Sequence, residues 1–296
     1  MDLREYQQQA HLTEKHVHVT NSDIVVPILG LAGEVGELLN EYKKRLRDGE
    51  AHMRFPERVA EELGDILWYV AETATKFGLD LENIAERNLE KTRARWGVPE
   101  DSGPSFNPRA RMFDAGFPEH ERFARRIVAN FRQSTKDGTV KIRVFVDGKQ
   151  YGQDLTDNAY HADGYRFHDV FHLACAAVLG WSPVSRRNLG LKRRSDREVD
   201  QVEDGGRAIA TEEGISALVF AYACEHNSLD GVRSVDYDLL KAIRIMTARF
   251  EVAVCTTGEW ERAILMGYEV WKQVEKNQGG KVELDLDGCT IRYIEM

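Results

Sequence analysis

Cysteine and long apolar runs are both scarce in this chain. Only four cysteines occur in 296 residues, and none forms a Cys-x-x-Cys pair. Dense cysteine patterns mark disulfide scaffolds and zinc modules, so we expect these four to be buried free thiols. No apolar run approaches the roughly 18–20 residues that span a bilayer, and the first residues do not resemble a signal peptide. These absences predict a cytoplasmic protein without a membrane partner.

An excess of positive charge is also lacking. The chain has 40 Lys and Arg against 49 Asp and Glu, for a net charge of −9. Stable nucleic-acid binding relies on phosphate neutralisation by basic residues, so we expect none here. Proline is rare too, with seven in total, and four of them fall between residues 97 and 118. This composition predicts a linker at 98–118 between a domain at 1–97 and a domain at 119–296.

Two short acidic pairs lie on consecutive predicted helices near the N-terminus. Glu34 and Glu37 follow one another at a spacing of three, as do Glu62 and Asp65. Residues three apart are neighbours on a helix surface, so each pair can share one ion. Carboxylate oxygens are the ligands that Mg²⁺ prefers, which indicates a metal-dependent enzyme for a phosphorylated substrate. The alternative is that both pairs simply face solvent.

Apolar and glycine residues surround the acidic pairs. At 100° per residue, each helix has an apolar stripe, and the acids border it. Several glycines interrupt the helices although each costs about 1 kcal/mol relative to alanine. We therefore expect either a close approach of the helices or room for a ligand. The glycines are Gly30, Gly33, Gly36 and Gly64.

The combined pattern resembles the MazG-like all-α nucleoside triphosphate pyrophosphohydrolases, whose signature is E-x-x-E, a gap, and E-x-x-D. Residues 80–97 look like the closing helix of that family, and the resemblance covers residues 1–97, about a third of the chain. It implies a helical bundle, active as a homodimer or homotetramer, that hydrolyses a nucleoside triphosphate to a monophosphate and pyrophosphate. It also implies that all four acids serve as catalytic Mg²⁺ ligands, with Mn²⁺ as a substitute.

Further residues are candidates for holding the nucleotide. The resemblance implies this role for Asn88, Lys91 and Arg95 on the closing helix. Lys43, Lys44 and Arg47 follow the first acidic pair and are candidates for the triphosphate tail, although a solvated helix end is the alternative. Tyr6 and residues 7–9 are candidates for the base or sugar. A regulatory module that senses a nucleotide, with the C-terminal domain as effector, and a purely structural bundle are the competing interpretations of the first domain.

The second domain has a mixed pattern that predicts an α+β fold. Residues 140–152 and 281–296 alternate apolar and polar side chains around the turns Asp147-Gly148 and Asp287-Gly288. Each pattern predicts a β-hairpin, and the two hairpins are expected to form one small antiparallel sheet. Helical patterns are predicted at 119–134, 163–179, 211–226, 236–257 and 259–276. The whole chain is thus expected to be mainly α.

A second metal site is indicated by two histidines four residues apart. His168 and His172 would face the same side of a helix, a spacing that suits metal binding. The other candidate ligands are Asp169, Glu212 and Glu213, and the site would serve a second metal-dependent phosphohydrolase. Alternatively, the histidines are partly buried and bond to neighbouring polar groups. The segment 212–223 also loosely echoes 61–72, so a diverged second bundle is a further interpretation.

A charged segment separates the helices of this second site. Residues 185–207 are basic first and acidic afterwards. A solvated or mobile loop is the default expectation for such a segment. The alternative is a flap that closes on phosphates.

Overall fold

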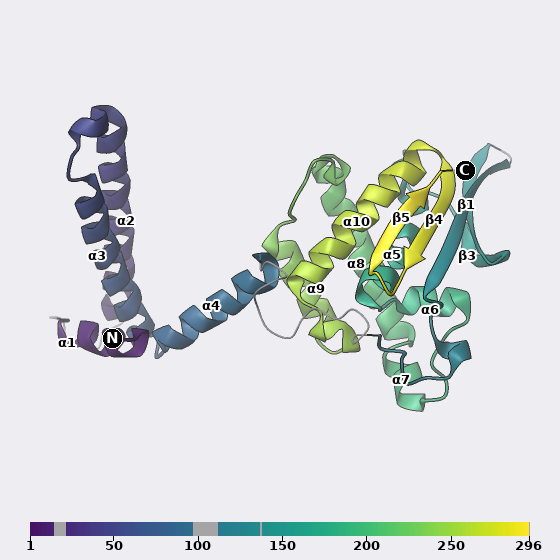
Figure 1. Ribbon diagram of the computed structural model, residues 1–296, viewed down its shortest axis with the longest axis horizontal. Helices are drawn as coiled ribbons and strands as arrows, with labels where there is room; N and C mark the ends of the chain where they lie inside the picture. The colour runs from purple at the N-terminus through teal and green to yellow at the C-terminus, as the bar shows by residue number, and fades with distance from the viewer. Residues whose placement is uncertain (15–21, 97–111, 137, 296) are drawn as a thin grey trace. The chain divides into compact units, whose positions relative to one another are not determined.

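The structure is a computed structural model that describes residues 1–14, 22–96, 112–136 and 138–295 (Figure 1). The side chains of residues 22–23, 90–91, 93–96 and 136 lie outside this description. The chain divides into two compact units, Met1–Arg93 and Ala94–Met296, and each is described by itself. Among the described helices, none combines the length and the apolar character that crossing a bilayer requires.

The first unit is helical, as the sequence predicted. Its helices are α1 (Leu3–Leu12), α2 (Ser22–Asp48), α3 (Phe55–Lys76) and α4 (Leu81–Trp96), and the 3₁₀ turn η1 (Gly49–Ala51) follows α2. Figure 1 shows α2 and α3 running side by side in opposite directions. Pro56 stands in the first turn of α3, where its missing N–H costs no hydrogen bond.

Glycine serves two different purposes in this helix pair. A Cβ on Gly30 would come within 2.2 Å of the Tyr69 ring, so glycine permits the close approach of α2 to α3. A Cβ on Gly33, Gly36 or Gly64 would meet nothing within 4 Å. The first glycine thus fits the expectation of close packing, and the other three border open space beside the acidic pairs.

The core of the first unit is small. Ala10 of α1, Ala71 of α3 and Leu81 of α4 form its buried centre. The apolar stripe of α2 stays open instead, since Leu39 is 64% exposed and Tyr42 is 56% exposed. Leu63 on α3 is 50% exposed. A single copy of this unit therefore leaves much of the apolar surface of its longest helix pair in solvent.

The second unit contains one antiparallel sheet with the strand order β3-β2-β1-β4-β5. The strands are β1 (Arg126–Lys136), β2 (Thr139–Val146), β3 (Lys149–Leu155), β4 (Gly279–Asp285) and β5 (Thr290–Ile294). The two predicted hairpins are β2–β3 and β4–β5, and β1 joins them by pairing with both β2 and β4. The expected sheet is confirmed, but its central strand was not foreseen.

The prediction of a helix at 119–134 is wrong. Residues 119–121 form the 3₁₀ turn η3 (Glu119–Glu121), and β1 begins at Arg126. Ile127, Ala129 and Phe131 are buried at every second position, whereas Val128 between them is 40% exposed. This period of two is the pattern of a half-buried strand, and polar residues in the segment obscured it.

Helices cover the sheet and enclose the core of the second unit. Helix α5 (Asp169–Leu179) is buried along its whole length and packs against α10 (Thr257–Lys276) and the strands β4 and β5. The remaining helices are α6 (Pro183–Leu189), α7 (Arg197–Val202), α8 (Gly206–Glu225) and α9 (Tyr237–Thr247), with η4 (Tyr165–Phe167), η5 (Asn227–Leu229) and η6 (Glu251–Val254). The helix predicted at 236–257 thus ends early, because extended backbone at Phe250 separates α9 from η6.

The four cysteines are free, as expected, but the prediction that all four are buried is wrong for Cys224. Cys175, Cys255 and Cys289 are buried, and Cys224 is exposed. The second unit is also not a second helical bundle, because its core rests on a sheet. The echo between segments 212–223 and 61–72 therefore reflects local helical pattern alone.

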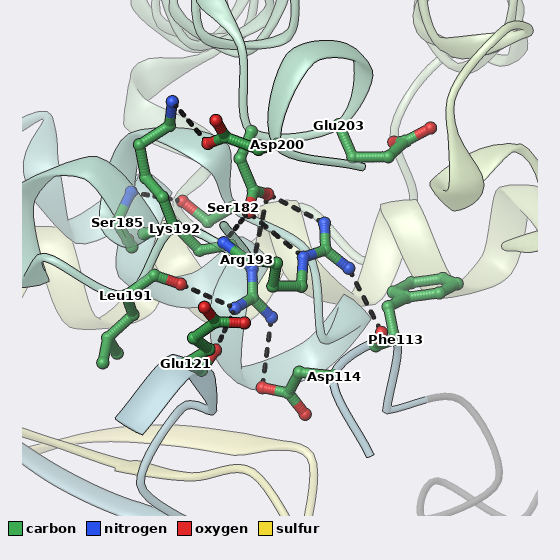
Figure 2. A network of polar contacts seen from close by, with 12 residues as sticks. Phe113, Asp114, Glu121, Ser182, Ser185, Leu191, Lys192, Arg193, Asp200 and Glu203 are labelled. Carbon is green, nitrogen blue, oxygen red and sulfur yellow. Dashed lines mark hydrogen bonds and ion pairs between the residues drawn. The ribbon is translucent and has the colours of Figure 1, made fainter. Parts of the chain in front are cut away.

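The charged segment 185–207 is partly internal, because Arg186, Arg193 and Asp204 are buried in an ion-pair network (Figure 2). The expectation of a solvated or mobile loop is therefore wrong for these three residues, whereas Arg194, Asp196 and Glu198 are exposed. The alternative of a flap that closes on phosphates stays a prediction. Arg193 is 1% exposed and bonds to both carboxylate oxygens of Asp204, with its Nη2 2.8 Å from Oδ1. The same guanidinium makes two bonds to Glu251, at 2.9 and 2.7 Å. Arg193 and Asp204, which looked solvated in sequence, thus pair with each other in the core.

The network also reaches the end of the expected linker 98–118. Asp114 is 1% exposed, receives the backbone N–H of Phe123 at 2.8 Å and pairs with Arg186 at 3.1 Å. Arg193 donates to the backbone carbonyl of Phe113 at 3.1 Å. The structure therefore places residues 113 and 114 in the second unit.

Candidate functional sites

Helices α2 and α3 bring the two acidic pairs together. Carboxylate oxygens of Glu34, Glu62 and Asp65 all lie within 4.8 Å of one another. Glu37 lies outside this tight group and accepts from Asn40 at 3.5 Å. No described residue forms an ion pair or a hydrogen bond with the three clustered carboxylates. Within the described part of the chain, the cluster therefore concentrates negative charge without a cationic side chain to balance it.

The concentrated negative charge affects the pKa of Glu62. Partial burial, followed by the negative charges of Glu34 and Glu37, raises the pKa of Glu62 above its usual value. Asp65 contributes in the same direction. A divalent cation placed among these oxygens would remove this repulsion, so the donor set fits a hard metal ion.

The basic candidates beyond the first pair have local partners. Lys44 forms a short ion pair with Glu41, which also lies 3.0 Å from Nε2 of His52. Arg47 pairs with the neighbouring Asp48 at 2.7 Å. Lys43 is exposed on the same helix. A phosphate ligand would have to compete with these two existing pairs for Lys44 and Arg47.

The candidate nucleotide-binding residues on α1 and α4 differ in whether the fold already uses them. Gln7 uses its amide to bond Thr75, Leu79 and Leu81, which ties α1 to the α3–α4 junction, so its position serves the fold. Asn88 is exposed on α4. The side chains of Lys91 and Arg95 lie outside the described residues.

A second cluster lies between α5 and α8. Ligand atoms of His168, His172 and Glu213 all lie within 4.8 Å of one another. Nε2 of His172 is 3.3 Å from Oε2 of Glu213, and Nε2 of His168 is 4.0 Å from the same oxygen. Oδ1 of Asp169 lies 3.9 Å from Nε2 of His168. The structure thus gathers the residues that the sequence singled out.

Glu212 has a different role from its neighbour. It is fully buried and accepts three hydrogen bonds, from His172 Nδ1 at 2.8 Å, Ser182 Oγ at 2.6 Å and the Val184 backbone at 2.8 Å. Its carboxylate therefore orients His172 and the start of α6. Ser182 escaped the sequence analysis, although its place before Pro183 is typical of a helix N-cap, which it forms by accepting from Ser185.

Burial and charge act against each other at the two histidines. Burial lowers the pKa of His168, and the nearby Asp169 only partly offsets this effect. Burial also disfavours a charged His172, but the carboxylates of Glu212 and Glu213 outweigh it and raise the pKa of His172 to about 10. The same histidine lowers the pKa of Glu213.

The comparisons with known proteins agree with this two-part organisation. Residues 27–97 match the MazG nucleotide pyrophosphohydrolase domain, and residues 108–296 match the MazG C-terminal domain. The fold thus defines a two-unit protein. Its first unit is helical with paired acids on α2 and α3, and its second unit contains a sheet. The chain belongs to the MazG family, and its first unit is a nucleotide pyrophosphohydrolase domain of a generally metal-dependent type.

One curated relative adds a partial match. The chain is similar to the gene 37 protein of Mycobacterium phage L5, with 40% identity over 79 residues. The match covers 25% of this chain and 69% of the phage protein. No solved structure matches the chain.

Proposed function

We propose that the first unit hydrolyses a nucleoside triphosphate to a nucleoside monophosphate and pyrophosphate, with Mg²⁺ bound by Glu34, Glu37, Glu62 and Asp65. The observation that carries the proposal is the convergence of carboxylates from both acidic pairs within 4.8 Å, without a described cation partner. The match to the pyrophosphohydrolase domain over residues 27–97 supports the reaction class. The complete acid set favours an enzyme over a nucleotide sensor.

The reaction needs a water molecule aligned with the α phosphorus and a stabilised pyrophosphate leaving group. Bound Mg²⁺ lowers the pKa of a coordinated water and neutralises phosphate charge. The carboxylates would hold the metal, and a glutamate beside it would orient the attacking water and accept its proton. Glu37 suits this last role, because it is exposed outside the tight group of three and would therefore contact the ion through this water. Among the three basic candidates on α2, Lys43 is the one for which the structure describes no ion pair, whereas Lys44 and Arg47 have partners, so Lys43 can meet the phosphate tail without losing one.

We further propose that the first unit acts as a homodimer or homotetramer joined through α2 and α3. The exposed apolar residues of these helices support this arrangement, and Leu39, Tyr42 and Leu63 are each at least half exposed. Exposed apolar side chains on one helix pair are typical of an interface. The acids border the same surface, so a partner copy would also enclose the substrate.

The function is tested by incubating the full chain with each nucleoside triphosphate and Mg²⁺, and by measuring monophosphate and pyrophosphate. Glu62→Gln should lower kcat/KM by at least about 100-fold, equivalent to about 2.7 kcal/mol of transition-state stabilisation. Glu34→Gln should behave alike, because both remove a charged ligand.

Glu61→Gln is the matched control. Glu61 precedes Glu62 on α3, is exposed and pairs with Arg58 at 2.7 Å. Its loss removes the same charge from the same turn without touching the cluster, so near wild-type activity is expected. Full activity in Glu62→Gln, or equal losses in the two variants, would refute the assigned site. Release of inorganic phosphate instead of pyrophosphate would refute the reaction.

A further inference from the structure

We propose that the second unit binds one divalent transition-metal ion, of the Zn²⁺ class, through Nε2 of His168, Nε2 of His172 and a carboxylate oxygen of Glu213. The site is separate from the acidic cluster of the first unit and takes a different class of ion. Two imidazoles and one carboxylate are a donor set that proteins use for zinc and for Fe²⁺, whereas Mg²⁺ prefers oxygen ligands alone.

The first argument is the orientation of the histidine rings. Nδ1 of His168 lies 2.8 Å from the backbone carbonyl of Tyr165, an oxygen that can only accept. Nδ1 of His172 lies 2.8 Å from Oε1 of Glu212. In both rings Nδ1 therefore carries the hydrogen, which leaves the lone pair of each neutral ring on Nε2. Metal-binding histidines are held in this way, with the second nitrogen donating to a carbonyl or carboxylate.

The second argument is an unpartnered buried atom. His172 is 0% exposed, and its Nε2 has no hydrogen-bond partner among the described residues, although Glu213 Oε2 lies 3.3 Å away. Oδ2 of Asp169 is buried and unpartnered as well. Buried polar atoms are nearly always satisfied, so these two atoms indicate a bonding partner that the described residues do not supply.

The third argument is the spacing of the ligand atoms. Four ligands about 2.0–2.1 Å from a tetrahedral zinc lie about 3.4 Å from each other. The separations from Glu213 Oε2 to the two Nε2 atoms are 3.3 and 4.0 Å. All three ligand atoms lie within 4.8 Å of one another, and the Glu213 side chain, which is 38% exposed, has room to adjust its carboxylate toward both nitrogens.

The fourth position has its own candidates. Oδ1 of Asp169 is 3.9 Å from Nε2 of His168, and a water molecule is the other possibility. His168 also lines a small aromatic cavity together with Ser216, Phe220 and Trp271. Three protein ligands and one exchangeable position would make the site open to a small oxygen-containing ligand.

The main competitor is a proton in place of the metal. A protonated His172 between Glu212 and Glu213 would be an internal ion pair, and it would need no ion from solution. The two explanations differ in what His168 does, because the proton model gives its Nε2 no function. They are therefore distinguished by substitution of His168 and by direct metal measurement.

The experiment uses the untagged full chain, stripped with a chelator and titrated with Co²⁺ in excess Mg²⁺. Mg²⁺ occupies oxygen-only sites, so the strong visible absorption of four-coordinate Co²⁺ with nitrogen ligands reports the second unit. We expect one equivalent of Co²⁺ per chain, displaced by Zn²⁺ and unaffected by further Mg²⁺. His168→Gln and Glu213→Gln should each weaken binding by more than about 100-fold, beyond the loss typical for residues that only orient ligands.

His226→Gln is the matched control. His226 is also partly buried, donates from Nδ1 to a backbone carbonyl, that of Tyr222 at 2.7 Å, and stacks on a tyrosine ring. His168 shares each of these features through Tyr165. The control should bind Co²⁺ like the wild type, and near-ultraviolet circular dichroism checks that each variant is folded. Absence of visible absorption, or equal binding by folded His168→Gln and wild type, would overturn the proposal without affecting the proposed hydrolase.

Discussion

The two units of the chain handle charge in opposite ways. In the first unit, Glu34, Glu62 and Asp65 lie together without a described cation partner. In the second unit, the buried Arg193 meets Asp204 and Glu251 through a set of hydrogen bonds between 2.7 and 3.2 Å. The acidic cluster of the first unit is thus the charge that we propose a ligand neutralises, whereas the charge around Arg193 is neutralised within the fold.

Apolar surface follows the same division. The second unit has a large core that includes the fully buried Trp181 and Trp260, whereas the first unit buries only a few small residues around Ala71. A region that exposes both uncompensated charge and apolar surface is expected to bind other molecules there. The first unit is thus expected to depend on metal, substrate and a partner copy, and the second is expected to be stable alone.

The largest expected effect comes from breaking the internal charge network. Arg193→Ala leaves Asp204 and Glu251 without their main partner, and removing one member of a buried ion pair costs about 3–5 kcal/mol. Denaturant unfolding, followed by the fluorescence of the buried tryptophans of the second unit, measures the loss.

Lys192→Ala provides the comparison. Lys192 pairs with Asp200 at 2.9 Å, but both side chains are at least 25% exposed. Such a pair contributes less than about 1 kcal/mol, so little change is expected. If the two variants were equally stable, the ion pairs of Arg193 would contribute no more than an exposed pair. The proposed difference between the two units would then be refuted.

A second prediction concerns the apolar face of the first unit. Leu39→Glu places a charge in the proposed interface, and burying an unpaired carboxylate costs several kcal/mol. Light scattering coupled to size-exclusion chromatography should show the mass of a dimer or tetramer for the wild type and of a monomer for the variant. Leu12→Glu on α1, where the leucine is 76% exposed, should leave the mass unchanged. A wild-type monomer would remove the proposed interface.

Much of the fold was predictable where local pattern and tertiary structure agree. The helices with acidic pairs and the two Asp-Gly hairpins all appeared, because periodicity and turn residues carry their signal in a few neighbouring positions. The strand β1 was missed because its buried positions include the small Ala129, and because Arg132 and Gln133 interrupt the apolar pattern.

The charge network could not be predicted from local pattern. Arg193 finds its partners 11 residues away at Asp204 and 58 residues away at Glu251, so a basic run in sequence looks solvated. The candidate site in the second unit also depends on residues that are distant in sequence. The spacing of His168 and His172 indicated a shared face, but the ring orientation depends on a backbone carbonyl and on Glu212, 40 residues from His172.

The smallest expected effect is a difference in pH dependence between the units. The pKa of Glu62 is raised in the folded state, so folding without metal is opposed at neutral pH. This opposition fades as the pH falls into the range just above the ordinary glutamate pKa of about 4.3, because the folded state then takes up a proton first. Glu62→Gln should therefore melt above the wild type at pH 7 without divalent cations, and this advantage should shrink towards pH 4.5.

Asp114 should show the opposite sign. Burial alone would raise its pKa, but the Phe123 amide, Arg186 and Arg125 outweigh burial and hold the pKa of Asp114 below its usual range. Its ionised form therefore stabilises the second unit, and this contribution is lost only as the pH falls below the ordinary aspartate pKa of about 3.9. Asp114→Asn should melt below the wild type by the same amount at pH 7 and pH 5, as measured by calorimetry. A deficit that disappeared between these values would mean that burial outweighs Arg186 and Arg125 and raises the pKa of Asp114 above its usual range, and the distinction between internally and externally neutralised charge would no longer hold.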